Sequence, residues 1–429
     1  GVDASAVKAG YREYLFQCAP PYYEDPIVLV KGLGVWATDA EGQEYLDFFS
    51  GILSTGIGHC HPEVVQAIQD QVATLGHTST LYLTENQVEF ARRLAEIAPG
   101  RLTKTFFTNS GTEAVETAVV LACMYTGRSE IIALRYGYSG RSILATNLTA
   151  HSQWRPLPTT VPGIKHTLSP YPYRCPFHSP CDERCLDAFA RDLEEVILTT
   201  TNGKPAAFMA ETIQGVGGYI VPPPGYFQRI VEIVHQYGAV FICDEVQAGF
   251  GRTGDKWFGI EHWNVEPDIM VMAKTIANGY PVAATMTRPE IADAWTAKTI
   301  STFGGNPVAM ASAIATNEVM VREKVPARSA ARGKQLRKGL DDLKRKFEWI
   351  GEVRGMGLMQ ALELVDDPKT KTPSGKKAKA LMEATKKERL LIGVGGLYGH
   401  VIRLGPSMLV TEDEVDDALG RLERACRKV

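Results

Sequence analysis

Hydrophobic positions follow two different periods along this chain. Stretches with the period of an amphipathic helix, residues 63–75, 85–98, 113–126 and 225–237, alternate with short apolar runs bounded by turn residues. We interpret the runs as buried strands, at 106–107, 131–134, 207–210, 240–243 and 269–272. A short apolar run does not by itself distinguish a strand from a helix, so the alternation carries the prediction. It predicts an α/β fold with a large, mostly parallel sheet.

The two ends of the chain predict a second, smaller unit. Residues 34–49 have the pattern of two short strands joined by a turn at 39–42. Beyond a predicted helix at 307–323 the sequence becomes lysine-rich, with strands predicted at 352–363 and 401–404 and helices at 376–388 and 412–427. We therefore predict a large domain at 61–315 and a small α+β domain at 316–429, to which residues 1–60 contribute. The lysine-rich stretch 369–377 is predicted to be an exposed, solvated loop.

Composition and charge narrow the classes of partner. Hydrophobic residues make up 45% of the 429 residues, charged residues 22%, and the net charge is −3. This is the profile of an ordinary globular protein, without a field that attracts nucleic acid or an anionic membrane. We expect small molecules and a second copy of the chain as partners. No transmembrane run or secretory signal is recognisable, so we expect a cytoplasmic location, or the mitochondrial matrix if a transit peptide was removed.

Two charged residues follow predicted strands in positions suited to chemistry. Asp244 comes directly after the apolar run 239–243, and Lys274 directly after 269–273. In open α/β sheets ligands bind beyond the carboxyl ends of the strands, where both side chains are expected. A lysine shielded from water has a lowered pKa and becomes a nucleophilic amine. Alone, Asp244 is as well explained by a surface turn, and most lysines after strands are simply exposed.

A third element has the pattern of a phosphate site. After a short strand, Ser110, Gly111 and Thr112 form a turn into an alanine-rich helix. Free N–H groups at a helix N-terminus bind a phosphate dianion well, although the same residues also make an ordinary N-cap. A phosphate cradle, a carboxylate and an amine at one sheet edge are the groups that pyridoxal 5′-phosphate (PLP) requires.

Several segments also resemble the class III (ω-amino acid) aminotransferases of PLP fold type I, the aspartate-aminotransferase-like fold. They are Asn109-Ser-Gly-Thr-Glu-Ala, Glu211-Thr-Ile-Gln-Gly, Cys243-Asp-Glu-Val-Gln-Ala-Gly-Phe-Gly-Arg-Thr-Gly, Ala273-Lys-Thr-Ile-Ala-Asn-Gly, Ser301-Thr-Phe-Gly-Gly-Asn-Pro and Val401-Ile-Arg-Leu-Gly-Pro-Ser-Met. They occur in the family's order over nearly the whole chain. The resemblance implies an aminotransferase that works in two half-reactions, alternating between PLP and pyridoxamine phosphate.

The resemblance also implies roles for residues around the cofactor. Lys274 holds PLP and shuttles the proton, and Asp244 pairs with the pyridine nitrogen. Thr302 is similar to the hydroxyl that reaches the phosphate of a neighbouring subunit, which implies a homodimer with the active site at its interface, or a tetramer. The remaining cofactor-binding residues by the same resemblance are Ser110, Gly111 and Thr112 at the phosphate, Gln247 at the phenolic oxygen and Tyr138 stacked on the ring.

Substrate recognition is implied for three further residues. Arg403 resembles the family arginine that binds a substrate carboxylate, and Glu211 the residue that pairs with this arginine when no carboxylate is present. Arg141 occupies the position of an arginine that binds the distal carboxylate in some relatives, or is a structural arginine. The second type of alanine–glyoxylate aminotransferase is the most similar subgroup, followed by the 4-aminobutyrate aminotransferases. A decarboxylase or lyase on the same fold also fits these segments, as does a PLP-binding protein without activity.

Two departures from the family pattern concern specificity. The family usually has glycine after the lysine, where this chain has Thr275, and we expect that side chain to crowd the cofactor or its approach and so to narrow the acceptor side. The family's aromatic-His-Gly segment contains Ser139 here, so a hydrogen bond at the ring edge is expected to change.

The cysteines form one cluster among single core residues. Cys175, His178, Cys181 and Cys185 have a spacing that a structural zinc ion accepts. The same spacing is compatible with a disulfide or with free thiols. Free thiols are favoured, and no metal ion is expected.

Overall fold

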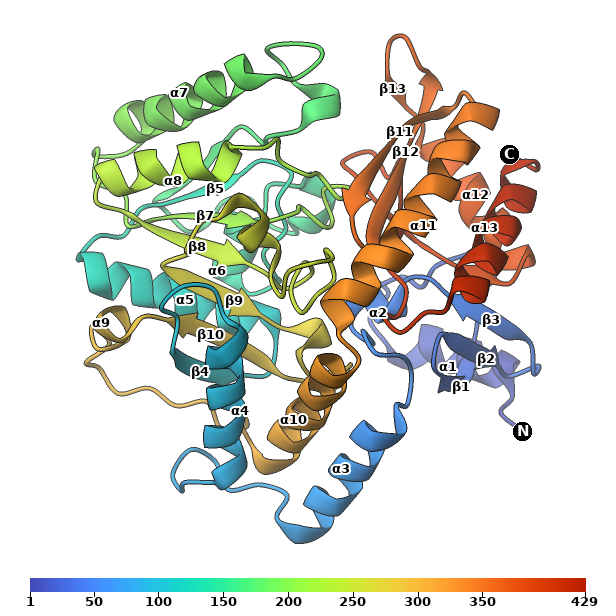
Figure 1. Cartoon of the computed structure of the whole chain (residues 1–429), viewed down its shortest axis with the longest axis horizontal. Helices are drawn as coiled ribbons and strands as arrows, with labels where there is room; N and C mark the ends of the chain where they lie inside the picture. The colour runs from blue at the N-terminus through green and yellow to red at the C-terminus, as the bar shows by residue number, and fades with distance from the viewer.

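A seven-stranded sheet forms the centre of one lobe in the computed structural model, which describes all residues 1–429 (Figure 1). In spatial order its strands are β4 (Lys104–Thr108), β10 (Ala283–Thr287), β9 (Ile269–Met272), β8 (Val240–Asp244), β7 (Ala207–Glu211), β5 (Ile131–Leu134) and β6 (Ile164–Thr167). The two pairs that β10 makes, with β4 and with β9, are antiparallel, and every other pair in this sheet is parallel. The predicted α/β fold with a mostly parallel sheet is therefore confirmed, and β4, β7, β8 and β9 all end at one edge.

Alternate residues of each central strand enter two different hydrophobic layers. In β8, Ile242 packs with α5 (Gly111–Thr126), whereas Phe241 and Cys243 pack on the opposite face with α7 (Glu183–Thr200) and α8 (Tyr226–Gln236). Side chains alternate across a strand, so a sheet covered on both faces needs apolar residues at every position. This burial explains the continuous apolar runs in the sequence.

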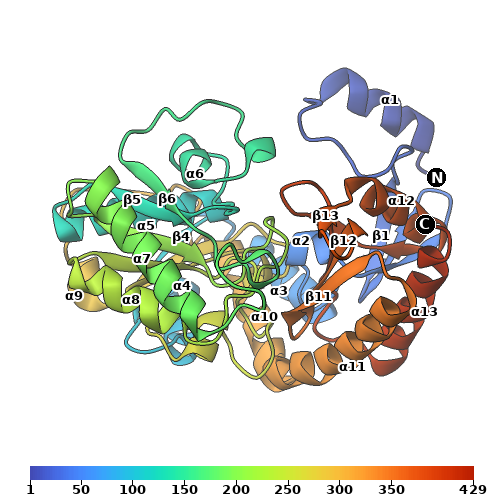
Figure 2. The same cartoon turned by 90° about the horizontal axis from the view of Figure 1, so that it is seen from above.

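The second lobe contains two smaller sheets covered by helices (Figure 2). One sheet has the order β11-β12-β16-β15, and the other β1-β2-β3-β14. The strands are β1 (Leu29–Leu33), β2 (Trp36–Asp39), β3 (Glu44–Asp47), β11 (Ile350–Met356), β12 (Met359–Asp367), β13 (Thr372–Pro373), β14 (Leu390–Leu391), β15 (Gly393–Gly395) and β16 (Val401–Leu404). Because β3 pairs with β14, the N-terminal segment shares a sheet with the C-terminal part.

The helices outside the central layers connect and cover these sheets. They are α1 (Ala4–Tyr14), α2 (Ser50–Leu53), α3 (Pro62–Thr74), α4 (Glu85–Ile97), α6 (Ile143–Leu148), α9 (Pro289–Ala292), α10 (Pro307–Arg322), α11 (Val325–Lys346), α12 (Gly375–Lys387) and α13 (Glu412–Cys426), with 3₁₀ turns η1 (Ser152–Trp154), η2 (Pro172–Arg174), η3 (Gly259–Trp263) and η4 (Lys274–Ala277). Helix α1 buries no residue and projects from the body in Figure 2. Since α10 runs through residue 316, the division of the chain at that point stays a prediction.

Two predictions for the C-terminal part were wrong. The single strand expected at 352–363 is a hairpin of β11 and β12 that turns at Gly357, which has a positive φ of 55°. The stretch 369–377 is not a free loop, because β13 pairs with β12 and Ser374 caps α12. In both places the backbone gains hydrogen bonds from neighbours that are distant from the local sequence pattern.

Candidate active site

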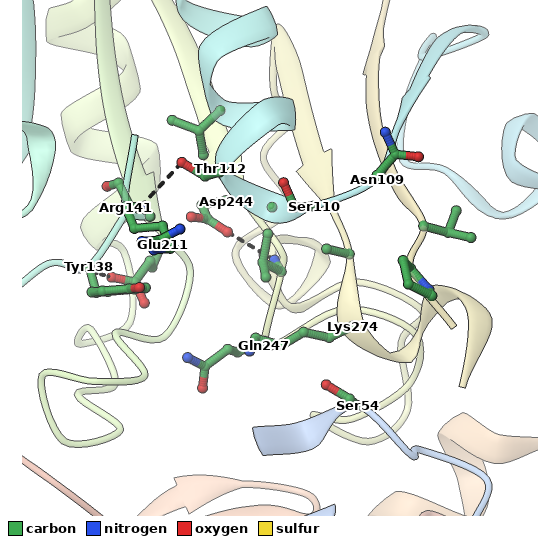
Figure 3. Close-up of a pocket in the computed structure, with 18 of the residues that line it drawn as sticks. Ser54, Asn109, Ser110, Thr112, Tyr138, Arg141, Glu211, Asp244, Gln247 and Lys274 are labelled. Carbon is green, nitrogen blue, oxygen red and sulfur yellow. Dashed lines mark hydrogen bonds between the residues drawn. The ribbon is translucent and has the colours of Figure 1, made fainter. Parts of the chain in front are cut away.

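A cavity of about 340 Å³ opens at the carboxyl edge of the large sheet (Figure 3). Its walls come mainly from the segments that follow β4, β5, β7, β8 and β9. The predicted residues that line it are Ser110, Gly111, Thr112, Tyr138, Ser139, Arg141, Glu211, Asp244, Gln247 and Lys274. Folding thus brings together groups that are up to 164 positions apart in the sequence (274 − 110 = 164).

Successive side chains of a strand point to opposite faces of the sheet, and this determines which carboxylates reach the cavity. Asp244 and Glu211 continue the faces of β8 and β7 that pack on α5, so both point toward the N-terminus of that helix. Glu245 falls on the opposite face and is fully buried. There it accepts hydrogen bonds from Thr212 Oγ1 (2.8 Å) and from the N–H group of Ile260 (2.7 Å). Glu245 is therefore a structural partner, and Asp244 the carboxylate available to a ligand.

Lys274 is held where its amine is largely shielded from water. Its backbone lies in the left-handed region, with φ of 54°, a conformation that costs a non-glycine residue about 1–2 kcal/mol. Burial lowers the pKa of its amine to about 8, and the positive charge of Arg403 adds to this, while Asp244 and Glu211 oppose it. Lys274 is consequently a nucleophilic amine near neutral pH rather than a surface cation.

The pKa of Asp244 shifts in the opposite direction. Burial raises it to about 6, against the N–H group of Val246 (2.9 Å from Oδ1) and the charge of Lys274. Above that pH the carboxylate is charged and needs a cationic or N–H partner. The protonated nitrogen of a pyridine ring would be such a partner.

The first turn of α5 forms the predicted cradle. Ser110 is the N-cap, and its Oγ exchanges hydrogen bonds with the Glu113 backbone and side chain. The N–H groups of Gly111 and Thr112 have no acceptor within the helix and are free for an anion. The Thr112 hydroxyl instead accepts from the N–H groups of Arg141 (3.2 Å) and Ser142 (3.1 Å). It holds the 140–142 loop against the cradle.

Two further side chains that line the cavity, those of Gln247 and Tyr138, are also available to a ligand. The buried Gln247 amide makes no hydrogen bond with the protein, and its oxygen is fully enclosed. Tyr138 lies over the cavity, with its ring edge-to-face on Trp154 (5.8 Å, 76°). An amine, a carboxylate, free N–H groups, an unpaired amide and an aromatic ring therefore face one space, as a phosphorylated pyridine aldehyde requires. The site fits PLP.

The predicted ion pair between Glu211 and Arg403 is absent. Glu211 accepts instead from the N–H groups of Tyr138 (2.9 Å) and Gly215 (2.8 Å). Burial and the nearby charge of Asp244 raise the pKa of Glu211, against these N–H groups and the charge of Arg403. Arg403 donates to the Val394 carbonyl (2.9 Å). The buried arginine keeps Nη1 without a partner.

The expectation that Thr275 crowds the cofactor was wrong. Thr275 does not line the cavity, and its hydroxyl donates to the Leu53 carbonyl (2.8 Å). Its methyl group touches Gly56, where an added Cβ would lie only 2.4 Å from Cγ2.

Two other predicted residues differ in their relation to the cavity. Ser139 lines it, and the Ser139 N–H group donates to Thr149 Oγ1 (3.0 Å). Thr302 is exposed and outside the cavity of this single chain.

Comparison with known proteins agrees with this geometry. The family model "Aminotransferase class-III" matches residues 18–426. The chain belongs to the class III aminotransferases. An alanine–glyoxylate aminotransferase 2 homologue from Arabidopsis thaliana, described as mitochondrial, is 39% identical over all of this chain and 89% of that protein. An acetylornithine aminotransferase from Methanopyrus kandleri is 38% identical over 95% of this chain and 96% of its own length.

A solved structure adds the cofactor. The PLP-bound amine transaminase of an uncultivated Pseudomonas species is 31% identical and has a TM-score of 0.90 over 96% of this chain and 97% of that one. This class III enzyme is accordingly a PLP-dependent aminotransferase. None of its helices combines the length and the apolar sequence needed to cross a membrane.

Proposed function

We propose that this aminotransferase moves an amino group from alanine or an ω- or β-amino acid to a small 2-oxo acid, with Lys274 and Asp244 as its catalytic residues. The observation that carries the proposal is that both side chains, with their pKa values shifted toward each other, face the cavity below the α5 N-terminus. Opposed shifts of this kind mark groups that exchange or hold a proton. Glyoxylate, pyruvate and 2-oxoglutarate are the candidate acceptors.

Each residue of the cavity has a proposed role that follows from its position. When bound, PLP supplies an aldehyde carbon and a protonated ring that withdraws electrons from the reacting carbon. Asp244 would hold the proton on the ring nitrogen, and the N–H groups of Gly111 and Thr112 would bind the phosphate. Lys274 would hold the aldehyde carbon of the cofactor, and its Nζ would carry the proton that leaves the donor carbon next to nitrogen. Tyr138 and Gln247 would orient the ring by stacking and by a hydrogen bond to its oxygen.

Arg403 is the proposed binding group for a substrate carboxylate. Its guanidinium lies 5.0 Å from the Phe49 ring centre and 5.6 Å from that of Tyr219, so its plane is fixed. The free Nη1 gives a buried carboxylate a charge-assisted partner. Glu211 does not occupy Nη1, because both of its carboxyl oxygens accept from backbone N–H groups. Arg141, exposed at the cavity rim, is the proposed partner of a second, distal carboxylate in dicarboxylic substrates.

The decisive experiment mixes the purified enzyme with an amino donor alone. Formation of pyridoxamine phosphate and the matching oxo acid supports transfer, whereas release of CO₂ with unchanged cofactor would indicate a decarboxylase. Lys274→Ala should abolish turnover, because no other amine lies in the cavity, while the exposed Lys369→Ala should not change it. Full activity of Lys274→Ala would refute the assignment.

The substrate pair requires a matrix of donors and acceptors. Alanine, β-alanine, 3-aminoisobutyrate and 4-aminobutyrate are to be tested against glyoxylate, pyruvate and 2-oxoglutarate. We expect alanine or a β-amino acid with glyoxylate or pyruvate to react fastest. A preference for 4-aminobutyrate and 2-oxoglutarate would instead establish a 4-aminobutyrate aminotransferase. Arg403→Lys should raise KM for every acceptor, since a lysine cannot replace the planar, two-pronged contact.

We also propose a homodimer in which Thr302 completes the partner's phosphate site. In the sequence Thr302 lies between Ile300 and Phe303, whose side chains are exposed (54% and 58%), and the Phe303 ring centre is 5.1 Å from that of His77. Leu83, six positions after His77 in the sequence, is also exposed (96%). Large exposed apolar side chains are typical of association surfaces. Leu83→Asp should produce monomers in light scattering, and Thr302→Val should weaken PLP retention without dissociating the dimer. A monomeric, fully active wild-type enzyme would contradict both.

For location we propose the cytoplasm or the mitochondrial matrix. The support is that the Arabidopsis relative is described as mitochondrial. Fractionation of source cells with an antibody to this chain tests it, and recovery in a secreted fraction would exclude it.

A further inference from the structure

Three cysteines without a part in amino transfer converge between a loop and the start of α7. Cys175 directly follows η2, Cys181 lies in the loop and Cys185 in the first turn of the helix. Their Sγ atoms all lie within 4.8 Å of one another, and those of Cys175 and Cys185 are 3.4 Å apart. Cys185 is fully buried and the other two are half-buried.

We propose that Cys175, Cys181 and Cys185 bind one structural zinc ion, with His178 as the fourth ligand. Tetrahedral zinc with bonds of about 2.3 Å holds its sulfur ligands roughly 3.8 Å apart, close to the separations found here. A disulfide would use two of the sulfurs and leave the convergence of the third unexplained. The sequence spacing alone did not favour a metal, and it is the meeting of all three sulfurs that changes this prediction.

The position of Cys185 favours a thiolate. It lies in the first turn of α7, where the positive end of the helix dipole stabilises negative charge. A bound cation would offset the repulsion between three neighbouring thiolates.

His178 is the proposed fourth ligand of the zinc ion. It lies between Cys175 and Cys181 in the sequence, is half-buried and forms no side-chain hydrogen bond. The loop that carries it is packed on α7, since the rings of Phe177 and Phe189 meet edge-to-face at 5.2 Å. The His178 nitrogens are not among the atoms that converge with the sulfurs, so the side chain must move toward them to complete a Cys₃His site.

The ion would fasten a segment that joins the two lobes. Arg174, next to Cys175, bonds to Glu363 Oε1 on β12 (3.2 Å) and to the Lys371 carbonyl (2.7 Å). Because Arg174 adjoins Cys175, an ion that holds Cys175 against α7 would also hold Arg174 in its contacts with Glu363 and Lys371. The expected role is structural, and independent of the aminotransferase reaction.

The test is the metal content of the holoenzyme, purified without chelator. We expect one zinc per chain by mass spectrometry and a sulfur shell at about 2.3 Å by X-ray absorption. Cys181→Ser should lose the zinc and His178→Ala should retain it more weakly, whereas Cys60→Ser, at an exposed cysteine outside the cluster, should keep it.

A wild-type measurement covers the case in which Cys181→Ser fails to fold. A thiol-specific mercurial should release zinc, detected with a metal-sensitive dye, and lower the Tm. Metal-free enzyme with titratable thiols would overturn the proposal. So would a Cys175–Cys185 disulfide found by non-reducing peptide mapping.

Discussion

The role of Thr275 follows from its contacts in the fold and not from its position in a sequence motif. Thr275 comes directly after Lys274, the proposed catalytic residue, yet its hydroxyl donates to the Leu53 carbonyl away from the cavity. Thr275→Val keeps the shape and leaves a buried carbonyl unpaired, at a cost of about 1–3 kcal/mol. We expect a lower Tm and an unchanged ratio of kcat/KM between donors. The exposed Thr199→Val is the control, and a shifted donor preference at unchanged stability would contradict this role.

If Lys274 binds the cofactor as we propose, its amine should set the pH dependence of PLP incorporation. Because burial lowers its pKa to about 8, the neutral, nucleophilic form becomes dominant above that pH instead of near the ordinary value of 10.5. The rate at which apoenzyme incorporates PLP should rise with pH and level off above about pH 8. Stopped-flow absorbance over a pH series measures it. A rate still rising steeply at pH 10 would mean that the amine is exposed to water.

At the level of elements, α11 owes its position to a glycine. A Cβ on Gly333 would lie 2.4 Å from the backbone of Gly357, at the turn of the β11–β12 hairpin. Gly333→Ala must therefore separate helix and hairpin, and overpacking of this kind costs about 1–3 kcal/mol. In α13, a Cβ on Gly420 meets only Arg424 Nη1, at 3.6 Å. Gly420→Ala should stabilise by about 0.5–1 kcal/mol through helix propensity. Thermal unfolding distinguishes the pair, and equal effects would refute the contact.

The extent to which elements were predictable depends on what covers them. Strands β5, β7, β8 and β9 were predicted because burial on both faces leaves a continuous apolar signal. The sequence did not indicate α11, since most of its surface is charged and only a narrow stripe such as Leu336, Leu340 and Leu343 is buried. Nor did it indicate that β10 enters the sheet antiparallel, because the direction of a strand is set by its connection and not by its composition.

At the scale of the whole molecule, a buried carboxylate joins the two lobes. Glu363 on β12 is fully buried and bonds to His400 (2.9 Å), Arg174 (3.2 Å), Arg354 (3.4 Å) and the hydroxyl of Tyr171. Burial alone would raise its pKa, but His400 and Arg354 outweigh it and the pKa falls to about 2. The charged form is thus the one that the folded molecule favours.

This gives a pH window for stability. A carboxyl pKa lowered from 4.5 to about 2 contributes stability that is present above pH 4.5 and lost as the pH falls toward 2. The contribution is about 3 kcal/mol. Glu363→Gln should lower the free energy of unfolding at pH 7 and flatten its pH dependence in that window. Glu63→Gln, at an exposed ion pair, is the control and should change little. Parallel pH curves for Glu363→Gln and wild type would show that Glu363 does not carry this dependence.

The sequence by itself determined the central sheet and the placement of Asp244 and Lys274 at the sheet edge where we propose that catalysis occurs, because strand burial and the spacing of these residues are local properties of the chain. The tertiary structure decided what each of these groups contacts. In the folded chain Thr275 bonds to the Leu53 carbonyl outside the cavity, and Glu211 accepts from backbone N–H groups instead of pairing with Arg403. Three cysteine sulfurs also meet beside α7. Such contacts join residues far apart in the sequence or depend on side-chain direction, and spacing along the chain specifies neither.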